Sequence, residues 1–385
     1  MNRRSVLKAG AASLAAGVLP ATARSAAMSG PRRILVGSGT PDGILGFGWD
    51  AATGVLTPEG IAAEVSHSTW LALSPDKQFL YVACELEQFE GQPTGAVASF
   101  KVGQGKSGKL SQVASMGRGT CHLALDRTGR VVICANYSGG SAASFLVDDG
   151  RLTGAAWHEQ YSGHGPNKDR QEAAHAHFIS FSPDNRFVYV NDLGQDMIHI
   201  YKLDAKTAKL TPAGSWKSQA GAGPRTLHFA TGGSVAGKVA YCVNEMACTV
   251  DVLAHDAAEG SLKTVQQVDL LPANPTAGVV NSACDAVLTR DGRFAYFANR
   301  GDDFLMGFHI DPATGRLKAF EGSPRTGTGG QVPRNFTLDP TERWMLVANQ
   351  KSSNLTVFAR DTKTGRLAEA GKNYPAATPM CIVFV

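Results

Sequence analysis

The chain has 385 residues, of which 18% are charged, and its formal net charge at pH 7 is +4. So small a positive surplus, part of which lies in the first residues, gives no basic stripe of the kind that binds nucleic acid. Beyond the N-terminal segment there is no run of apolar residues as long as the 18 or more that a membrane-spanning helix needs, so we expect no such helix in the mature chain.

Residues 1–27 have the three parts of an export signal. The pair Arg3 and Arg4 precedes an apolar, Ala-rich stretch, and small residues within 21–27 offer a cleavage site. Paired arginines followed by Val-Leu-Lys resemble a twin-arginine signal, so we expect the twin-arginine export machinery as a partner. The sequence predicts a mature domain, 28–385, in the periplasm. The alternative is an incidental basic N-terminus on a cytoplasmic protein.

One pattern recurs seven times after the signal: an apolar run, a turn built on Asp or Gly, and a second apolar run that ends at a polar residue. The second runs are ILVGSG (34–39), LYVACE (80–85), VICANY (132–137), VYVNDL (188–193), AYCVNE (240–245), AYFANR (295–300) and MLVANQ (345–350). Equivalent positions lie 46 to 55 residues apart, which is the period of a propeller blade. The repeat predicts an all-β fold, a seven-bladed β-propeller with four-stranded antiparallel blades.

The two ends of the chain are predicted to share a blade. An apolar strand precedes six of the second runs, but none precedes the run at 34–39. The missing strand is found at the C-terminus, as MCIVFV at 380–385. We therefore expect this C-terminal strand to complete the first blade and close the ring, because closure removes the exposed strand edges of an open array.

The short Asp or Gly turn makes the first two strands of each repeat an antiparallel hairpin. The start of the first strand and the end of the second then lie side by side, and seven such corners surround one mouth of the central channel. Repeats four to seven place charged or polar residues there: His177, Asp192, Arg225, Glu245, Asp285, Arg300, Arg334 and Gln350. Taken singly, each has a structural alternative as a turn cap or ion-pair partner, but together they indicate a functional pocket.

A series of motifs in a specific order runs through residues 32–385. It comprises Gly163 to Gln171 (GHGPNKDRQ), His175-Ala176-His177, Ser182-Pro183-Asp184, Asp192-Leu193-Gly194, Gly223-Pro224-Arg225, Tyr241 to Glu245 (YCVNE), Asn299-Arg300-Gly301, Pro333 to Phe336 (PRNF) and Ala348-Asn349-Gln350. In these motifs the chain resembles the seven-bladed lactonase family, which includes the bacterial propeller-type 6-phosphogluconolactonase. It departs from the family pattern at Thr226, where His commonly follows Gly-Pro-Arg.

The resemblance implies hydrolysis of a sugar lactone, and the corner residues suit that reaction. Ring opening needs a base to activate water, donors or positive charge for the oxyanion, and an acid for the departing alkoxide. His177 and Glu245 are the candidates for base or acid, and Arg225 is the candidate for the catalytic anion stabiliser. Residues predicted to bind or orient the substrate are His175, Asp192, Asp285, Arg300, Arg334, Gln350 and Arg170.

We expect neither a cofactor nor a metal. A cation held by Glu245, Asp192 and Asp285 is conceivable, but the neighbouring arginines compete for the same carboxylates. The 7 cysteines are scattered and contain no C-x-x-C pair, which indicates buried, reduced thiols.

The leading interpretation is a periplasmic enzyme that opens a neutral aldonolactone such as gluconolactone. The alternatives are a 6-phosphogluconolactonase proper, since arginines suit phosphate, a lactone-forming cyclase acting on a muconate-type diacid, and a non-catalytic propeller that serves as a binding module.

Overall fold

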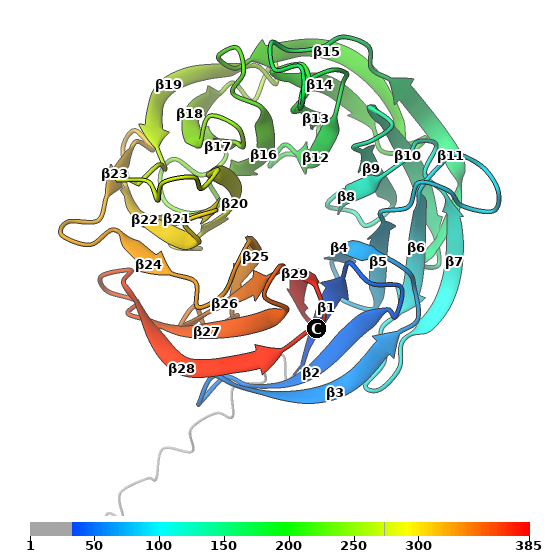
Figure 1. The fold of residues 1–385 in the computed structure, drawn as a ribbon. Helices are drawn as coiled ribbons and strands as arrows, with labels where there is room; N and C mark the ends of the chain where they lie inside the picture. The colour runs from blue at the N-terminus through cyan, green and yellow to red at the C-terminus, as the bar shows by residue number, and fades with distance from the viewer. Residues whose placement is uncertain (1–32, 273) are drawn as a thin grey trace, which may run out of the picture. The chain divides into compact units, whose positions relative to one another are not determined.

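Seven antiparallel sheets are arranged around a common centre (Figure 1). The computed structural model describes residues 33–272 and 274–385, and these residues form 29 strands and no helix. The seven-bladed β-propeller predicted from the repeat is confirmed. The predicted signal segment, 1–27, lies outside the described residues. Within the described part of the chain, no helix has the length and apolar character that a membrane span requires.

In blades two to seven the strands follow chain order from the centre outward. Blades two to four are formed by β4 (Ser68–Leu73), β5 (Phe79–Cys84), β6 (Ala96–Lys101) and β7 (Gly108–Ala114); β8 (Thr120–Leu125), β9 (Val131–Asn136), β10 (Ser141–Asp148) and β11 (Arg151–Gln160); and β12 (Ala176–Phe181), β13 (Phe187–Asp192), β14 (Met197–Asp204) and β15 (Lys209–Lys217).

Blades five to seven repeat this order. They are formed by β16 (Pro224–Phe229), β17 (Val239–Asn244), β18 (Thr249–His255) and β19 (Leu262–Asp269); β20 (Ser282–Leu288), β21 (Phe294–Arg300), β22 (Phe304–Ile310), β23 (Leu317–Ala319) and β24 (Arg325–Gly327); and β25 (Pro333–Leu338), β26 (Trp344–Asn349), β27 (Asn354–Arg360) and β28 (Leu367–Pro375). In the sixth blade β23 and β24 both pair with β22, so an interrupted outer strand replaces the single fourth strand that the sequence predicts.

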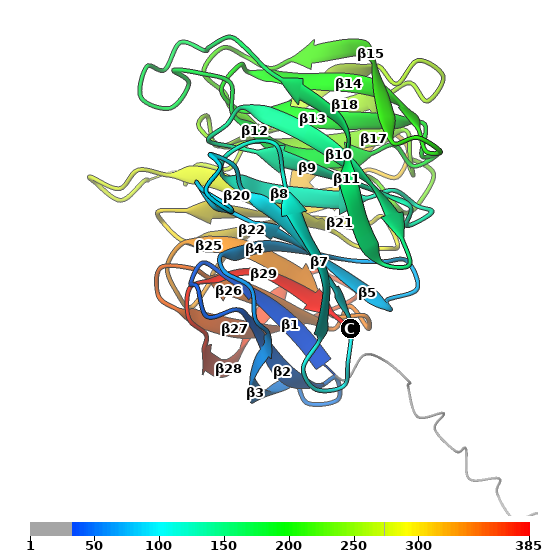
Figure 2. The same ribbon diagram turned by 90° about the vertical axis from the view of Figure 1, so that its right-hand side faces the viewer.

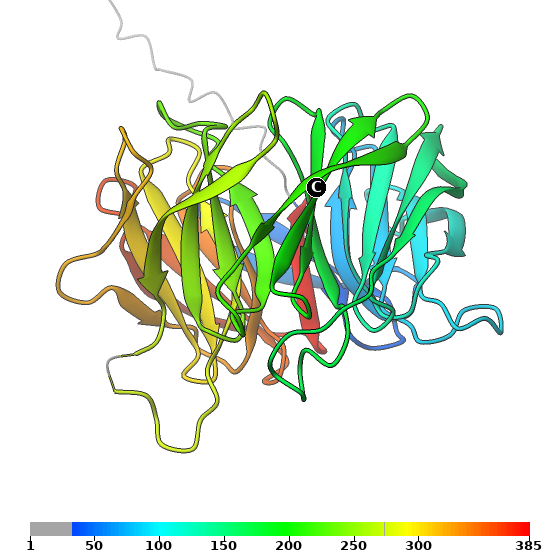
Figure 3. The ribbon, with the colours of Figure 1, turned by 90° about the horizontal axis from the view of Figure 1, so that it is seen from above.

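The first blade joins the two ends of the described chain. Its strands are, from the centre outward, β29 (Pro379–Phe384), β1 (Arg33–Ser38), β2 (Ile44–Asp50) and β3 (Val55–Ala63). β29 pairs antiparallel with β1, and Figures 2 and 3 show the red C-terminal strand next to the blue first strands from two further directions. The predicted closure by the C-terminal strand is thereby confirmed.

Tyrosines in the second strands tie several blades to their neighbours. In each case a buried phenol donates a hydrogen bond to a glycine carbonyl in the turn between the third and fourth strands of the next blade. The pairs are Tyr189 with Gly260, Tyr241 with Gly315 and Tyr296 with Gly365. Because a buried hydroxyl without a partner is costly, these bonds fix the angle between adjacent blades as well as their separation.

Deletion of residues 379–385 should abolish cooperative folding. The deletion removes the buried side chains of Met380, Ile382 and Phe384, each of which contributes roughly 1.5–3 kcal/mol, and it exposes the edge of β1. We expect insoluble protein or loss of the near-ultraviolet circular dichroism signal.

Deletion of Val385 alone is the matched control. It removes one backbone hydrogen bond, to the carbonyl of Arg33, and should leave a cooperative melt. If the protein lacking 379–385 melts at the temperature of the parent, ring closure is not what stabilises the fold.

Candidate active site

The predicted corners exist as hydrogen-bonded pairs at one end of the inner strands, which we call the mouth. The amide of Glu245, which follows β17, donates to the carbonyl of Gly223 just before β16 at 2.8 Å. The amide of Tyr137 donates to Gly119 in the third blade, also at 2.8 Å. Each hairpin therefore brings the side chain after its second strand next to the start of its first.

Every inner strand carries a β-bulge near its start. In β12, His177 is an extra residue between the paired positions Ala176 and Phe178, and Arg225 has the same place in β16. The equivalent residues of the other five inner strands are Thr69, Cys121, Cys284 with Asp285, Arg334 and Met380. We call this set the bulge ring. A bulge redirects a side chain out of the regular alternation and is frequent beside active sites.

A narrow cavity of about 10 Å³ lies among the bulge-ring residues, which is room for about one water molecule. Its walls comprise Cys121, His177, Arg225, Cys284, Asp285 and Arg334, with Trp70, His122, Phe178 and Thr226 from the next positions of the strands. The rings of His122 and Phe178 stack with centroids 3.8 Å apart, and Trp70 lies against both. These three rings form an aromatic layer beneath the bulge ring.

Glu245 is the centre of the charged cluster at the mouth. Its Oε1 lies 2.7 Å from Nη2 of Arg170, and its Oε2 lies 3.1 Å from Nη2 of Arg300 and 3.4 Å from Nε of Arg225. Burial alone would raise the pKa of Glu245, but the charges of Arg300 and Arg225 outweigh burial and hold this pKa well below its ordinary value. The carboxylate is therefore ionised at neutral pH, and it is a weak base.

His177 has the opposite electrostatic character. Burial, followed by the charge of Arg225, lowers the pKa of His177 well below its ordinary value, so its ring is neutral at pH 7. Nη1 of Arg225 contacts both ring nitrogens. Because a guanidinium only donates and a neutral imidazole has one accepting nitrogen, the lone pair of His177 faces Arg225 in this arrangement.

Further cations and aromatic groups complete the mouth. Arg334 lies 3.6 Å from the carboxylate of Glu85, and Arg170 also donates to the hydroxyl of Tyr137 at 3.3 Å. The ring of Tyr137 stacks on His175, with centroids 4.5 Å apart. The four arginines share this region with the carboxylates of Glu245, Glu85 and Asp285, and their guanidinium groups offer N–H donors to an anion or to a developing oxyanion.

Known proteins are similar to this chain in sequence and in fold. The profile described as "Lactonase, 7-bladed beta-propeller" matches residues 33–384. The chain belongs to this lactonase family. A 6-phosphogluconolactonase of Bacillus subtilis (strain 168) is 33% identical over 351 residues, which cover 90% of this chain and 95% of that protein.

Solved structures of proteins with similar sequences have the same fold as this chain. The periplasmic gluconolactonase of Pseudomonas aeruginosa superimposes with a TM-score of 0.83 and 31% identity, covering 92% of this chain and 98% of that one. A protein from Lactobacillus plantarum gives a TM-score of 0.84 at 31% identity, covering 92% of this chain and 99% of that one. The prediction of a lactone-hydrolysing enzyme is confirmed at the level of the family.

The lactonase brings five of the predicted site residues into one contact cluster, formed by Arg170, His177, Arg225, Glu245 and Arg300. Arg334 lines the same cavity as His177. His175 lies beside this cluster, but its Nδ1 is 3.0 Å from the carbonyl of Tyr137 and its Nε2 is 3.2 Å from the carboxylate of Glu172. Both ring nitrogens of His175 are therefore engaged by the protein itself.

Asp192 has the structural role that its position at a strand end also allows. Its Oδ1 accepts hydrogen bonds from the amides of His175 and Gln195, and its Oδ2 accepts one from the side chain of Gln195. The residue is fully buried. Its carboxylate caps the corner between β12 and β13 and holds the backbone from which His177 projects, so both of its oxygens are engaged by the protein itself.

Asp285 is held by neighbouring side chains, whereas Gln350 follows the corner arrangement described for Glu245. Asp285 lines the cavity, but its Oδ1 is 3.0 Å from Nε2 of His228 and its Oδ2 accepts a hydrogen bond from Asn335. Gln350 is held at its corner by the backbone, because its amide donates to the carbonyl of Val332 at 2.9 Å.

The site contains residues that the sequence did not single out. Tyr137 and Glu85 each follow directly after the second strand of a blade. This position is the feature of the sequence from which they could have been predicted. Thr226, where the chain departs from the family pattern, lines the cavity with a buried hydroxyl that has no hydrogen-bond partner within the described part of the chain.

Residues 33–272 and 274–385 contain no group of three or more His, Cys, Asp or Glu side chains placed to hold a metal ion. All seven cysteines are buried and unpaired. The predicted buried thiols are confirmed.

Glu245→Gln should lower the free energy of unfolding as well as activity. The Glu245 side chain is 6% exposed, and removing one charge of a buried pair typically costs about 3–5 kcal/mol because the partner charges remain unpaired. The measurement is urea unfolding followed by tryptophan fluorescence.

Glu85→Gln is the matched control, because that carboxylate is 31% exposed and lies 3.6 Å from Arg334. Its loss should cost at most about 1 kcal/mol. Equal losses in the two variants would contradict the view that Glu245 neutralises a buried arginine cluster.

Proposed function

We propose that this lactonase opens a sugar lactone such as gluconolactone to the aldonic acid, in the periplasm. The observation that carries the proposal is the contact between a neutral, buried His177 and the Arg225 guanidinium at two neighbouring bulges. This pair supplies an unprotonated base next to a fixed positive charge, which are the two groups that attack of water on a carbonyl requires.

The first step is the addition of water to the lactone carbonyl. In our proposal the carbonyl oxygen enters beside Arg225 and accepts its N–H, which frees the lone pair of His177. His177 then takes a proton from water while the water oxygen bonds to the carbonyl carbon. The charge that develops on the carbonyl oxygen is stabilised by Arg225 and by Arg334, which lines the same cavity.

The second step is the collapse of the tetrahedral intermediate. The carbonyl re-forms, the bond between the carbonyl carbon and the ring oxygen breaks, and the departing alkoxide takes the proton held by His177. The products are the aldonate and one proton released to water, which balances the hydrolysis. His177 thus serves as base and then as acid.

Glu245 fits a positioning role better than that of the base. Three guanidinium groups surround its carboxylate, and its lowered pKa makes proton abstraction from water unfavourable. Its charge instead keeps Arg170, Arg225 and Arg300 together, so that Arg225 faces His177 and the other two face the mouth.

A phosphorylated lactone is the second candidate. The guanidinium groups of the mouth suit an anionic substrate group, and the Bacillus subtilis relative is named a 6-phosphogluconolactonase. Two observations support the neutral lactone instead: the export pattern in residues 1–27, which separates the enzyme from cytoplasmic sugar phosphates, and the resemblance to a periplasmic gluconolactonase.

Purified protein should hydrolyse glucono-1,5-lactone well above the spontaneous rate, and His177→Ala should lower kcat by roughly 10²–10⁴-fold, the usual span for a positioned acid–base group. Because the pKa of His177 is lowered, its ring is already neutral at pH 6.5, and kcat/KM should stay constant from there to pH 8. Proton release in weak buffer, corrected for the uncatalysed reaction, measures both quantities.

His309→Ala, at an exposed position of β22, is the control and should keep parental kcat. Near-parental kcat in His177→Ala would place the base elsewhere. A kcat/KM for the 6-phosphorylated lactone more than about tenfold higher than for the plain lactone would favour the second candidate.

The location is tested separately. Replacing Arg3 and Arg4 by Lys should retain the precursor in the cytoplasm, because the twin-arginine machinery reads the arginine pair. The parental protein should appear in the periplasmic fraction with a new N-terminus near residue 28. Export of the double variant at the parental rate, or a parental protein that keeps Met1, would contradict the proposed location.

A further inference from the structure

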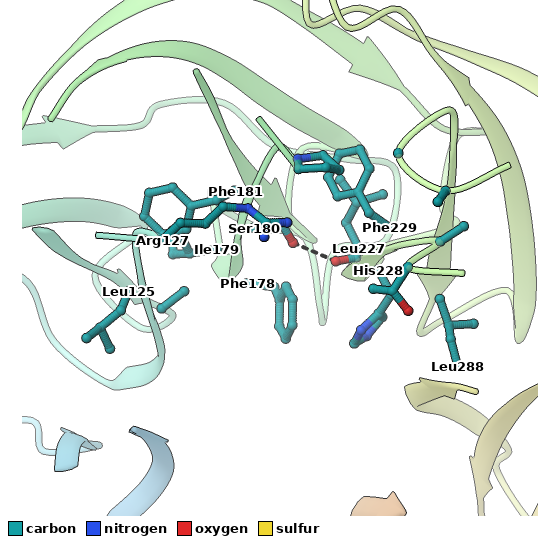
Figure 4. Close-up of a pocket in the computed structure, with 16 residues that line it drawn as sticks. Leu125, Arg127, Phe178, Ile179, Ser180, Phe181, Leu227, His228, Phe229 and Leu288 are labelled. Atoms are coloured by element: carbon teal, nitrogen blue, oxygen red, sulfur yellow. Dashed lines mark hydrogen bonds between the residues drawn. The ribbon is translucent and has the colours of Figure 1, made fainter. Parts of the chain in front are cut away.

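A much larger cavity than that of the active site lies at the other end of the same inner strands. It has a volume of about 730 Å³ and is lined by the later residues of β8, β12, β16 and β20 and by the turns that follow (Figure 4). We call it the lower cavity. The bulge ring lies at the starts of these strands, so the two cavities occupy opposite ends of the channel.

The aromatic layer separates the lower cavity from the active site. Phe178 lines both cavities, and its ring stacks on His122, with Trp70 against the pair. One polar contact crosses this layer: Nε2 of His228, in the lower cavity, lies 3.0 Å from Oδ1 of Asp285, in the wall of the active-site cavity. A ligand in the lower cavity would therefore not touch the reacting groups.

The walls of the lower cavity are mainly apolar and aromatic. Leu125, Phe181, Phe229 and Leu288 line it and are each partly exposed, although residues of this kind are usually buried. The hydroxyl of Ser180 is already used, since it donates to the carbonyl of Leu227. The cavity thus offers a flat, apolar body a large contact area with few polar groups to desolvate.

One fully charged side chain, that of the solvent-exposed Arg127, lines this apolar space. Arg127 lines the cavity, and Figure 4 shows its side chain extending over Phe181 toward Ser180. Its guanidinium has no ion-pair or hydrogen-bond partner in the described part of the chain, and no carboxylate is among the lining residues. A guanidinium in such surroundings is suited to bind a carboxylate or sulfonate.

We propose that the lower cavity is a second ligand site, which takes a small aromatic acid. The apolar body lies against Phe178, Phe229 and Leu288, and the acidic group pairs with Arg127. This site is independent of the lactone chemistry at the mouth, so its existence does not rest on the function proposed above.

The test uses 8-anilinonaphthalene-1-sulfonate, a fluorescent aromatic anion, with the full mature protein. We expect saturable binding of one molecule per chain. Arg127→Met keeps the apolar stem but removes the charge, and should weaken binding about tenfold, the size of one charge-assisted hydrogen bond. Leu288→Glu, which places a negative charge in the cavity, should weaken it by at least as much.

Arg130→Met is the matched control, because Arg130 belongs to the same turn but does not line the cavity. It should change the dissociation constant less than about twofold, since an exposed charge at a distance is screened by salt. Gluconate at millimolar concentration should not displace the probe.

Three results would each overturn the proposal: binding that does not saturate at one molecule per chain, equal effects of Arg127→Met and Arg130→Met, or displacement of the probe by gluconate. The last result would place the probe in the mouth. Lactone hydrolysis by Arg127→Met, measured in parallel, should equal that of the parent, so failure of this site and failure of the proposed activity are distinguishable.

Discussion

The antiparallel pairing of β29 with β1 is the constraint on which the rest of the structure depends. It gives the first blade an inner strand like those of the other six blades, so seven hairpins of nearly the same length face one axis. Residues far apart in sequence, such as Arg225 and Arg300, therefore converge from the ends of strands, and Arg170 joins them from the long connection between β11 and β12. The closed ring supplies the rigidity that lets a charged cluster persist in a buried position.

Closure alone would point regular, alternating side chains at neighbouring blades rather than at the channel. The bulge in each inner strand changes this, because the extra residue has no partner across the hairpin and turns toward the axis. His177, Arg225 and Arg334 all occupy this position. A single backbone irregularity, repeated by each blade, thus creates one ring of positions whose chemistry can vary without disturbing the packing between blades.

The sequence predicts much of this arrangement because the repeat is strong. Apolar runs that end at Asn, together with Asp or Gly turns, define hairpins, and hairpin geometry puts Glu245 near Gly223 and hence near Arg225. The sequence does not carry the direction of each polar side chain. Asp192 and Glu245 both stand at the end of a second strand, and the hairpin geometry predicts the same place for both. Asp192 nevertheless accepts hydrogen bonds from two backbone amides, whereas Glu245 binds three arginines. Which of these outcomes occurs depends on the neighbouring blades, and a bulge has no compositional signature.

The two ends of the channel differ because the layer between them is apolar. Burial, together with the charge of Arg225, lowers the pKa of His177 on one side of this layer, and the Arg225 charge acts more strongly in such buried surroundings than in water. Phe178, a member of the layer, also lines the lower cavity. A substitution that thins the layer, such as Phe178→Ala, would then affect both ends at once: it would admit water beneath His177 and remove an apolar contact surface from below. The contact between His228 and Asp285 is a polar connection between the two regions, but neither residue is among the groups proposed to react with the lactone.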